Sequence, residues 1–292
     1  MNILLTGSSG FFGKEILRNN TIYSIFTLNR KIGDYKYDLS KSIPDFDKYF
    51  DIVIHNAGKA HYIAKSNIEK ESFLEVNVKG TNNLLKGLEN KIPSQFVFIS
   101  SVAVYGLDSG QDISEGSPLL AQDPYGMSKI IAEKLVTDWC FQNNVICTIL
   151  RLPLLVAKSP PGNLGDMHKA IKRGFYFNIA SGSARKSMVL AEDVAFFIPR
   201  IAKVGGIYNL TDGKHPSFKC LSNVLSKNKV LSLPLFIAKA LARIGDLIGN
   251  WAPINSYKLK KIICDLTFDD SRARKMGWKP NSVIEYLKKN EL

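Results

Sequence analysis

The chain has 292 residues, of which 45% are hydrophobic and 22% charged, an ordinary composition for a globular protein. Its formal net charge is +13, but the basic residues are dispersed and no nucleic-acid-binding motif is present, so we expect no nucleic-acid partner and only a general attraction to small anions. Its four cysteines are widely spaced and its four histidines show no paired ligand pattern, so we predict reduced thiols, a cytoplasmic protein and no metal site.

The first half of the chain alternates between two hydrophobic periods. Short apolar runs rich in β-branched and aromatic residues predict strands at residues 2–5, 24–28, 51–55, 95–100 and 145–150. Helical patterns fall between most of these strands, at residues 13–19, 72–89 and 125–141. This alternation predicts an α/β fold with a doubly wound parallel sheet that is covered by helices on both faces. Pro44 lies in the short connection between the second and third strands, where we expect at most a stunted helix.

The alternation ends after Arg151. We expect helices at residues 166–172 and 191–203, a strand near residues 206–210 and short helices beyond. The chain should therefore divide into a sheet region at residues 1–152 and a smaller, mostly helical lobe at residues 153–292, with sheet elements returning near residues 186–211.

Two apolar stretches are long or apolar enough to be considered as a signal peptide or a membrane-associated segment. The run at residues 3–5 is too short for a signal peptide. Residues 231–249 are apolar but contain Lys239, Arg243 and Asp246, so we predict an amphipathic helix and no transmembrane span. We expect this helix to pack against the body of the protein or a partner, with contact with a membrane surface as the alternative.

The residues TGSSGFFG, at positions 6–13, follow the first predicted strand and open the first predicted helix. Glycine permits tight turns and lets backbone amides approach a ligand closely. The beginning of a helix then presents unpaired N–H groups and the positive end of the helix dipole to a phosphate. Gly7, Gly10 and Gly13 therefore predict a pyrophosphate-binding loop of the dinucleotide type.

The end of the second predicted strand indicates which dinucleotide is bound. Proteins of this kind that bind NAD usually carry an acidic residue there, which holds the ribose hydroxyls. This chain instead has LNRK at residues 28–31, with no carboxylate before Asp34. Arg30 would suit a 2′-phosphate, which favours NADP(H), with NAD(H) as the alternative. Arg30 as an ordinary surface residue at a strand end also stays open.

Tyr125 and Lys129 lie four residues apart at the start of a predicted helix, so they share one helix face. A nearby ammonium group lowers the pKa of a phenol, which suits proton transfer at an alcohol or carbonyl. Ser100 and Ser101 close the fourth predicted strand, at the carboxyl edge where ligands of such sheets bind. One of these serines is expected to bond to the same reacting oxygen.

Together these features resemble the extended short-chain dehydrogenases/reductases, and within them the NAD(P)-dependent nucleotide-sugar epimerases and dehydratases. The resemblance covers nearly the whole chain. The matching segments are TGSSGFFG (6–13), Asp38-Leu39, HNAG (55–58), VNVKGT (76–81), FISSVAVYG (98–106), PYGMSK (124–129), LRLP (150–153), Gly162-Asn163 and SRARKMGWKP (271–280).

The resemblance implies a Rossmann region at residues 1–152, a substrate lobe after it, and a role for each matching residue. Tyr125 would move the proton, Lys129 would bind the nicotinamide ribose and tune Tyr125, and Ser101 would hold the substrate oxygen. The residues expected to line the cofactor are Gly7, Ser9, Gly10, Phe11, Phe12, Gly13, Arg30, Asp38, Leu39, Asn56, Ala57, Gly58, Asn77, Ser100, Tyr125 and Lys129. Those expected to contact the substrate are Ser101, Asn163, and Arg185 or Lys186.

The resemblance also implies oxidoreduction at C4 of a UDP-sugar. Dehydration needs an acid–base pair after the catalytic serine, and Val102 and Ala103 stand there, so a dehydratase is not expected. We expect a reductase of a UDP-4-keto-6-deoxy-N-acetylhexosamine, in the synthesis of surface-polysaccharide precursors. The alternatives are a UDP-hexose or UDP-N-acetylhexosamine 4-epimerase and, from another class, a non-catalytic NADP(H)-binding regulatory protein. A homodimer formed through residues 72–89 and 125–141 is a further expectation.

Overall fold

The computed structural model describes residues 1–59, 66–158, 160, 162–226, 229–249, 252 and 254–290. Its centre is a seven-stranded sheet with the order β11-β7-β5-β4-β1-β2-β3, in which every pairing is parallel. The strands are β1 (Asn2–Thr6), β2 (Ser24–Asn29), β3 (Tyr35–Lys36), β4 (Ile52–His55), β5 (Gln95–Ser101), β7 (Ile146–Leu152) and β11 (Gly206–Asn209). The predicted parallel α/β sheet is thus confirmed.

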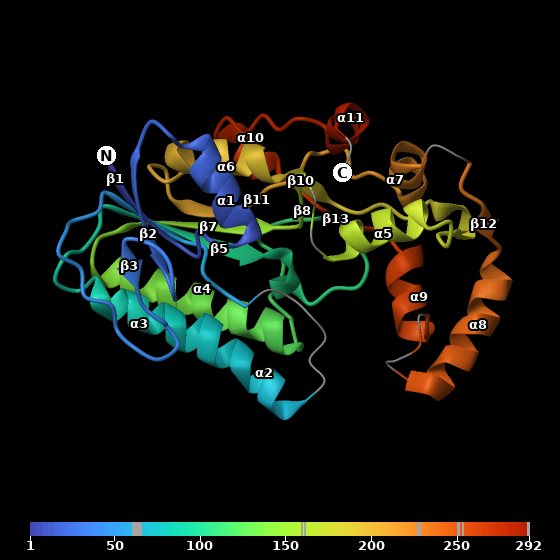
Figure 1. The fold of residues 1–292 in the computed structure, drawn as a ribbon, viewed down its shortest axis with the longest axis horizontal. Helices are drawn as coiled ribbons and strands as arrows, with labels where there is room; N and C mark the ends of the chain where they lie inside the picture. The colour runs from blue at the N-terminus through green and yellow to red at the C-terminus, as the bar shows by residue number, and fades with distance from the viewer. Residues whose placement is uncertain are drawn as a thin grey trace.

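Helices cover both faces of this sheet, as Figure 1 shows. Helices α1 (Phe11–Asn19) and α6 (Ala191–Ile201) pack on one face, and α3 (Gly80–Gly87) and α4 (Pro124–Gln142) on the other. The inner strands β1, β4 and β5 are almost wholly buried, because side chains on both of their faces meet helices. No helix forms between β2 and β4, where Pro44 lies; the short strand β3 runs there instead.

The helix expected at residues 72–89 is a composite of three pieces. It begins earlier, as α2 (Asn67–Phe73), passes through the π-helical turn η1 (Leu74–Lys79) and continues as α3. A π-turn inserts one residue into a helix, and such turns are frequent at functional sites. In this chain the turn contains the buried Asn77.

The two halves of the chain interleave. Helix α6 and strand β11 come from the second half and complete the sheet and its cover. Short strand pairs knit the rest together: β8 (Leu154–Val156) with β10 (Met188–Leu190), β9 (Asn178–Ile179) with β12 (Ser232–Leu233), and β6 (Gly110–Ile113) with β13 (Leu266–Phe268). The division at residue 152 stays a prediction.

Helices form most of the remaining lobe. They are α5 (Gly162–Lys172), α7 (Phe218–Leu225), α8 (Leu235–Ile248), α9 (Ser256–Ile263), α10 (Ser271–Lys275) and α11 (Val283–Lys289), with 3-10 turns η2 (Val102–Tyr105) and η3 (Ala180–Gly182) elsewhere in the chain. Within the residues described above, no helix is both long enough and apolar enough to span a membrane.

Candidate active site

The glycine-rich turn joins β1 to α1 at the carboxyl edge of the sheet. Gly7 has a φ of +69°, and a Cβ atom there would lie 2.7 Å from the Cα atom of Ala57. A Cβ atom on Gly13 would overlap the backbone of Gly7 and Ser8. Both positions therefore require glycine, because the turn, the end of β4 and the first turn of α1 meet backbone to backbone. We call this turn, from Gly7 to Gly13, the glycine cradle. Its backbone geometry is of the kind that binds a dinucleotide pyrophosphate.

The beginning of α1 is open toward a ligand. Gly10 is the N-cap residue, and it provides no side chain to bond the first amides of the helix. These amides and the helix dipole favour an anion. Ser9 and Phe11 are the neighbours of Gly10 in the chain, and Phe12 is buried in the core. The predicted roles of these three residues at the cofactor stay predictions.

Asn29, at the end of β2, is a residue that the sequence analysis missed. Its side-chain amide donates to Ser8 Oγ at 2.6 Å, and its Oδ1 accepts from Ser9 N at 3.3 Å. An uncharged amide thus stands next to the glycine turn, where NAD-binding proteins place a carboxylate. Arg30 follows it and is exposed. The carboxylate of Asp34 accepts hydrogen bonds from the amide and hydroxyl of Thr27.

Asp38 and Leu39 form the next part of the rim. The hydroxyl of Ser40 donates to Asp38 Oδ1 at 2.7 Å, and this bond, ahead of other causes, lowers the pKa of Asp38. Leu39 is buried, and its carbonyl accepts from Asn83 Nδ2 at 2.7 Å. This segment, which is predicted to line the cofactor, is therefore fixed against α3.

The end of β4 is tied to the glycine turn by side-chain hydrogen bonds. Asn56 Nδ2 donates to the carbonyl of Gly7 at 3.1 Å, and the amide of Ala57 donates to Thr6 Oγ1 at 2.9 Å. Gly58 continues this rim. A Cβ atom on Gly58 would lie 3.1 Å from Asn77 Oδ1. The two segments predicted to line the cofactor thus form one continuous edge.

His55 connects this edge to η1, a role that no motif indicated. Its Nδ1 lies 2.8 Å from Thr6 Oγ1 and its Nε2 lies 2.9 Å from Thr81 Oγ1. Because Thr81 Oγ1 donates to the carbonyl of Asn77, it accepts from Nε2, which assigns the neutral tautomer with hydrogen on Nε2. Burial lowers the pKa of His55 to about 3, with a smaller contribution from Lys129.

The three predicted catalytic residues lie at the carboxyl end of β5 and in the first turns of α4. Ser101 closes β5, and Tyr125 lies in the first turn of α4, where Asp123 caps the helix by accepting from the amide of Gly126. A hydrogen bond with Ser101 lowers the pKa of Tyr125, but burial raises it more, so the net shift is upward. The pKa of Tyr125 is therefore raised in this arrangement, and not lowered as expected from sequence.

Lys129 is almost fully buried, with 6% of its surface exposed. Its Nζ donates to the carbonyl of Ile99 at 2.8 Å and lies 4.7 Å from the ring centroid of Phe98. Burial lowers the pKa of Lys129 to about 8. Nζ is also 3.5 Å from where a Cβ atom of Gly58 would stand, so the ammonium faces the cofactor edge.

Asn77 and Ser128 connect the segment after β4 to the first turn of α4 by hydrogen bonds. Asn77 Oδ1 accepts from the amide of Lys59 at 2.6 Å, and its Nδ2 donates to Ser128 Oγ at 2.9 Å. Ser128 in turn donates to the carbonyl of Tyr125 at 2.7 Å. The π-turn therefore joins the β4 edge to the first turn of α4.

Ser100 points into a different environment from Ser101, because neighbouring strand residues face opposite sides of a sheet. Its hydroxyl donates to Glu133 Oε1 at 2.5 Å, and Glu133 forms a buried ion pair with Arg151 at 2.7 Å. Since this hydroxyl is engaged there, Ser101 is the better candidate to hold a substrate oxygen. A cofactor contact by Ser100 stays a prediction.

The predicted substrate contacts lie in the second lobe. Asn163 is exposed at the beginning of α5. Arg185 donates to the carbonyl oxygens of Lys214 at 2.8 Å and His215 at 3.1 Å, so its guanidinium supports a loop. Lys186 is half-buried, and burial lowers its pKa. Of the two basic residues, Lys186 is the better candidate for a phosphate contact.

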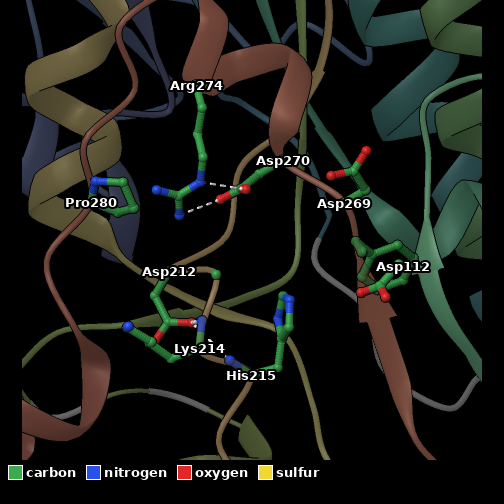
Figure 2. A pocket seen from close by; sticks show the side chains of 10 residues that line it. Asp112, Asp212, Lys214, His215, Asp269, Asp270, Arg274 and Pro280 are labelled. Carbon is green, nitrogen blue, oxygen red and sulfur yellow. Dashed lines mark hydrogen bonds and ion pairs between the residues drawn. The ribbon is translucent and has the colours of Figure 1, made fainter.

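A polar cavity of about 360 Å³ lies elsewhere in this lobe, and Figure 2 shows its lining. Two of its aspartates are held by an ion pair or by backbone amides. Asp270 Oδ1 accepts from Arg274 Nε at 2.7 Å, and Asp212 Oδ1 accepts from the amide nitrogens of Lys214 and His215. The cavity lining includes neither the glycine turn nor the three predicted catalytic side chains, so we assign it a structural role. Among the residues that the structure describes, no His, Cys, Asp and Glu cluster is arranged to hold a metal ion.

Comparison with known proteins agrees with this geometry. Residues 3–210 match the model of the NAD dependent epimerase/dehydratase family. The chain is 24% identical to an Escherichia coli O157:H7 N-acetyl-alpha-D-glucosaminyl-diphospho-ditrans,octacis-undecaprenol 4-epimerase (95% of this chain, 90% of the relative). It is also 24% identical to a UDP-glucose 4-epimerase of Vibrio cholerae (97% and 92%).

A solved structure shows the same fold. It is RMD from Pseudomonas aeruginosa complexed with NADPH, which superposes with a TM-score of 0.73 at 21% identity and covers 98% of this chain and 96% of the other. The glycine cradle, the Ser101–Tyr125–Lys129 group and the family match lead to one conclusion. The chain belongs to the NAD dependent epimerase/dehydratase family, and it is an NAD(P)-dependent enzyme that modifies nucleotide sugars.

Proposed function

We propose that the protein is a 4-epimerase of a UDP-hexose or UDP-N-acetylhexosamine. The observation that carries this proposal is the meeting of Ser101, Tyr125 and Lys129 beside the glycine cradle, with Val102 and Ala103 next in the chain. Neither of those two side chains transfers protons, which argues against dehydration. The named relatives, two 4-epimerases matched over nearly their whole length, favour epimerisation over the net reduction expected from sequence.

The glycine turn, Tyr125 and Lys129 would hold an NAD(P) cofactor, which would supply hydride transfer to and from C4 of the sugar. Tyr125 accepts the proton of the 4-hydroxyl and gives it back to the same oxygen. Ser101 holds that oxygen within reach of Tyr125, and Lys129 places positive charge at the cofactor edge, where it favours ionised Tyr125 once substrate is bound. The open N-terminus of α1 would stabilise the negative charge of the cofactor pyrophosphate.

A reductase is the second candidate, and Asn29 with Arg30 is the observation that favours it. An uncharged residue and a cation at the end of β2 suit the 2′-phosphate of NADP(H), and a reductase must exchange its cofactor with solution. We therefore propose NADP(H) as the preferred soluble cofactor if the protein reduces its substrate. A non-catalytic regulatory protein would not need Ser101, Tyr125 and Lys129 together, so we place this role last.

Two assays on the purified protein separate these candidates. The first incubates it with UDP-glucose, UDP-N-acetylglucosamine and N-acetylglucosaminyl-diphospho-undecaprenol, without added cofactor, and follows the 4-epimers by NMR. The second follows NADPH and NADH oxidation with a UDP-4-keto-6-deoxy-N-acetylhexosamine. Epimer formation without cofactor consumption supports the proposal. Stoichiometric NADPH consumption would replace it with the reductase, and NADPH binding without any turnover would support the regulatory role.

A further inference from the structure

Helix α8 turns its large apolar side chains outward. Its buried residues are the small Ala238, Ala242 and Gly245, which pack toward α9. The exposed large residues are Phe236, Ile237, Leu241, Ile244, Leu247 and Ile248. Leu247 is 89% exposed and Phe236 is 73% exposed. These six residues, here called the α8 face, form an apolar stripe at helical spacing.

Ala238, Ala242 and Gly245 determine which side of α8 faces the protein. A Cβ atom on Gly245 would overlap the carbonyl of Ile254, so α8 lies directly against the backbone of the segment that leads to α9. Asp246 accepts hydrogen bonds from the amide and hydroxyl of Ser256, which pins the same end of the helix. Figure 1 shows α8 at one end of the molecule, with α9 on its inner side. Of the packing expected from sequence, against the protein body or a partner, the apolar side of α8 does not show the first, and packing against a partner stays a prediction.

A second exposed apolar group lies close to the α8 face in the fold. Strand β12, which leads into α8, pairs with β9, and the amide of Asn178 donates to the carbonyl of Leu231. Leu231 is exposed, as are Phe175 and Phe177 in the connection between α5 and β9. The sequence of that connection is KRGFYFN, in which two basic residues precede the aromatic ones.

The charged side chains in the segment around the α8 face are almost all basic. Lys239 and Arg243 lie on α8 itself, along one flank of the apolar stripe. Residues 229–263 contain six basic residues and one acidic residue, which is the pinned Asp246. An apolar helix face bordered by Lys and Arg is the pattern of a helix that lies in the plane of an anionic membrane surface.

We propose that the α8 face, with its basic flank, docks the protein on an anionic bilayer surface. Phe236 and Leu247 enter the headgroup boundary, and Lys239 and Arg243 contact anionic headgroups. A second copy of this chain fits less well, because a two-fold contact through this face would bring the basic flanks of both copies together. The proposal stands on α8 and does not rest on the proposed function.

Vesicle sedimentation of the full chain tests this proposal. We expect about tenfold tighter binding to vesicles of phosphatidylethanolamine and phosphatidylglycerol than to vesicles of phosphatidylcholine. The double variant Ile244→Glu with Leu247→Glu should lose about tenfold or more of that binding. Lys239→Glu with Arg243→Glu should remove the preference for anionic vesicles.

Phe141→Glu is the matched control, because Phe141 is 85% exposed at the end of α4, far along the chain from α8. It should bind vesicles as the wild type does. No vesicle binding by the wild type, or equal binding by the α8 double variant, would overturn the proposal. A dimer in size-exclusion chromatography that only the α8 variant breaks, without vesicle binding, would assign this face to a second copy instead. Tyr125→Phe should leave vesicle binding unchanged, so a failed activity assay and a failed docking assay stay separate.

Discussion

The carboxyl edge of the sheet and the α8 end of the lobe use their side chains in opposite ways. At the sheet edge, polar side chains such as His55 and Asn77 are buried and fully bonded, and they hold backbone segments in fixed positions. At the α8 end, small residues are buried and large apolar ones are exposed. The first pattern preorganises chemistry. The second offers a surface to something outside the chain.

The largest expected effect of a substitution at the sheet edge is the loss of turnover at Tyr125. Tyr125→Phe removes the proton-transferring hydroxyl and should lower kcat by about 100- to 10,000-fold. Tyr257→Phe is the matched control, since Tyr257 is exposed on α9 and should keep wild-type turnover. Steady-state kinetics, with the substrate that the two assays proposed above identify, measure both. Near-wild-type turnover of Tyr125→Phe would contradict the catalytic assignment.

The buried pair Glu133–Arg151 supports the same edge from inside the sheet. Glu133→Ala leaves Arg151 charged and unpaired, which should reduce the free energy of unfolding by about 3–5 kcal/mol. The matched control is Asp138→Ala, whose pair with Lys134 is exposed and should contribute less than about 1 kcal/mol. Urea denaturation compares the two. Equal losses would mean that the buried network adds no stability beyond a surface pair.

The glycine cradle should tolerate no added methyl group. Gly13→Ala forces the turn away from α1 and should cost about 1–3 kcal/mol of stability, together with cofactor affinity. Gly116→Ala is the control, because a Cβ atom there would meet only Ser114 Oγ, at 3.9 Å. Thermal unfolding and NAD(P)H fluorescence titration give the two readouts. If both variants bind cofactor as the wild type does, the cradle has been misassigned.

Much of the sheet edge could be predicted because its signals are local. Gly7, Gly10 and Gly13 lie within one turn, and Tyr125 and Lys129 lie one helical turn apart, so spacing alone brings them together. Asn29, His55 and Glu133 were missed because their partners come from distant strands and helices. The amphipathic character of α8 could be predicted, but not which of its sides is buried, because the small residues that fit against α9 decide that.

A further expected effect is a pH dependence of stability that arises from His55. The unfolded chain binds a proton at this residue below about pH 6.5, whereas the folded protein does so only near pH 3. Stability should therefore fall as the pH drops from 6.5 toward 3. His55→Gln should flatten that part of the curve, and His168→Gln, at a more exposed site with a milder lowering of the pKa, should change it less. Urea unfolding at a series of pH values measures the slope, and identical slopes for all three proteins would contradict the buried neutral imidazole.

The central claim is that Ser101, Tyr125 and Lys129 carry out reversible oxidation at C4 of a UDP-sugar. It is tested most directly by incubating the purified protein with UDP-N-acetylglucosamine or UDP-glucose in deuterated buffer and following the sugar by NMR. The account predicts a mixture of 4-epimers, with hydrogen retained at C4, formed by the wild type and not by Tyr125→Phe. An unchanged sugar, together with stoichiometric NADPH oxidation on a 4-keto sugar, would contradict the epimerase and leave the same three residues to a reductase.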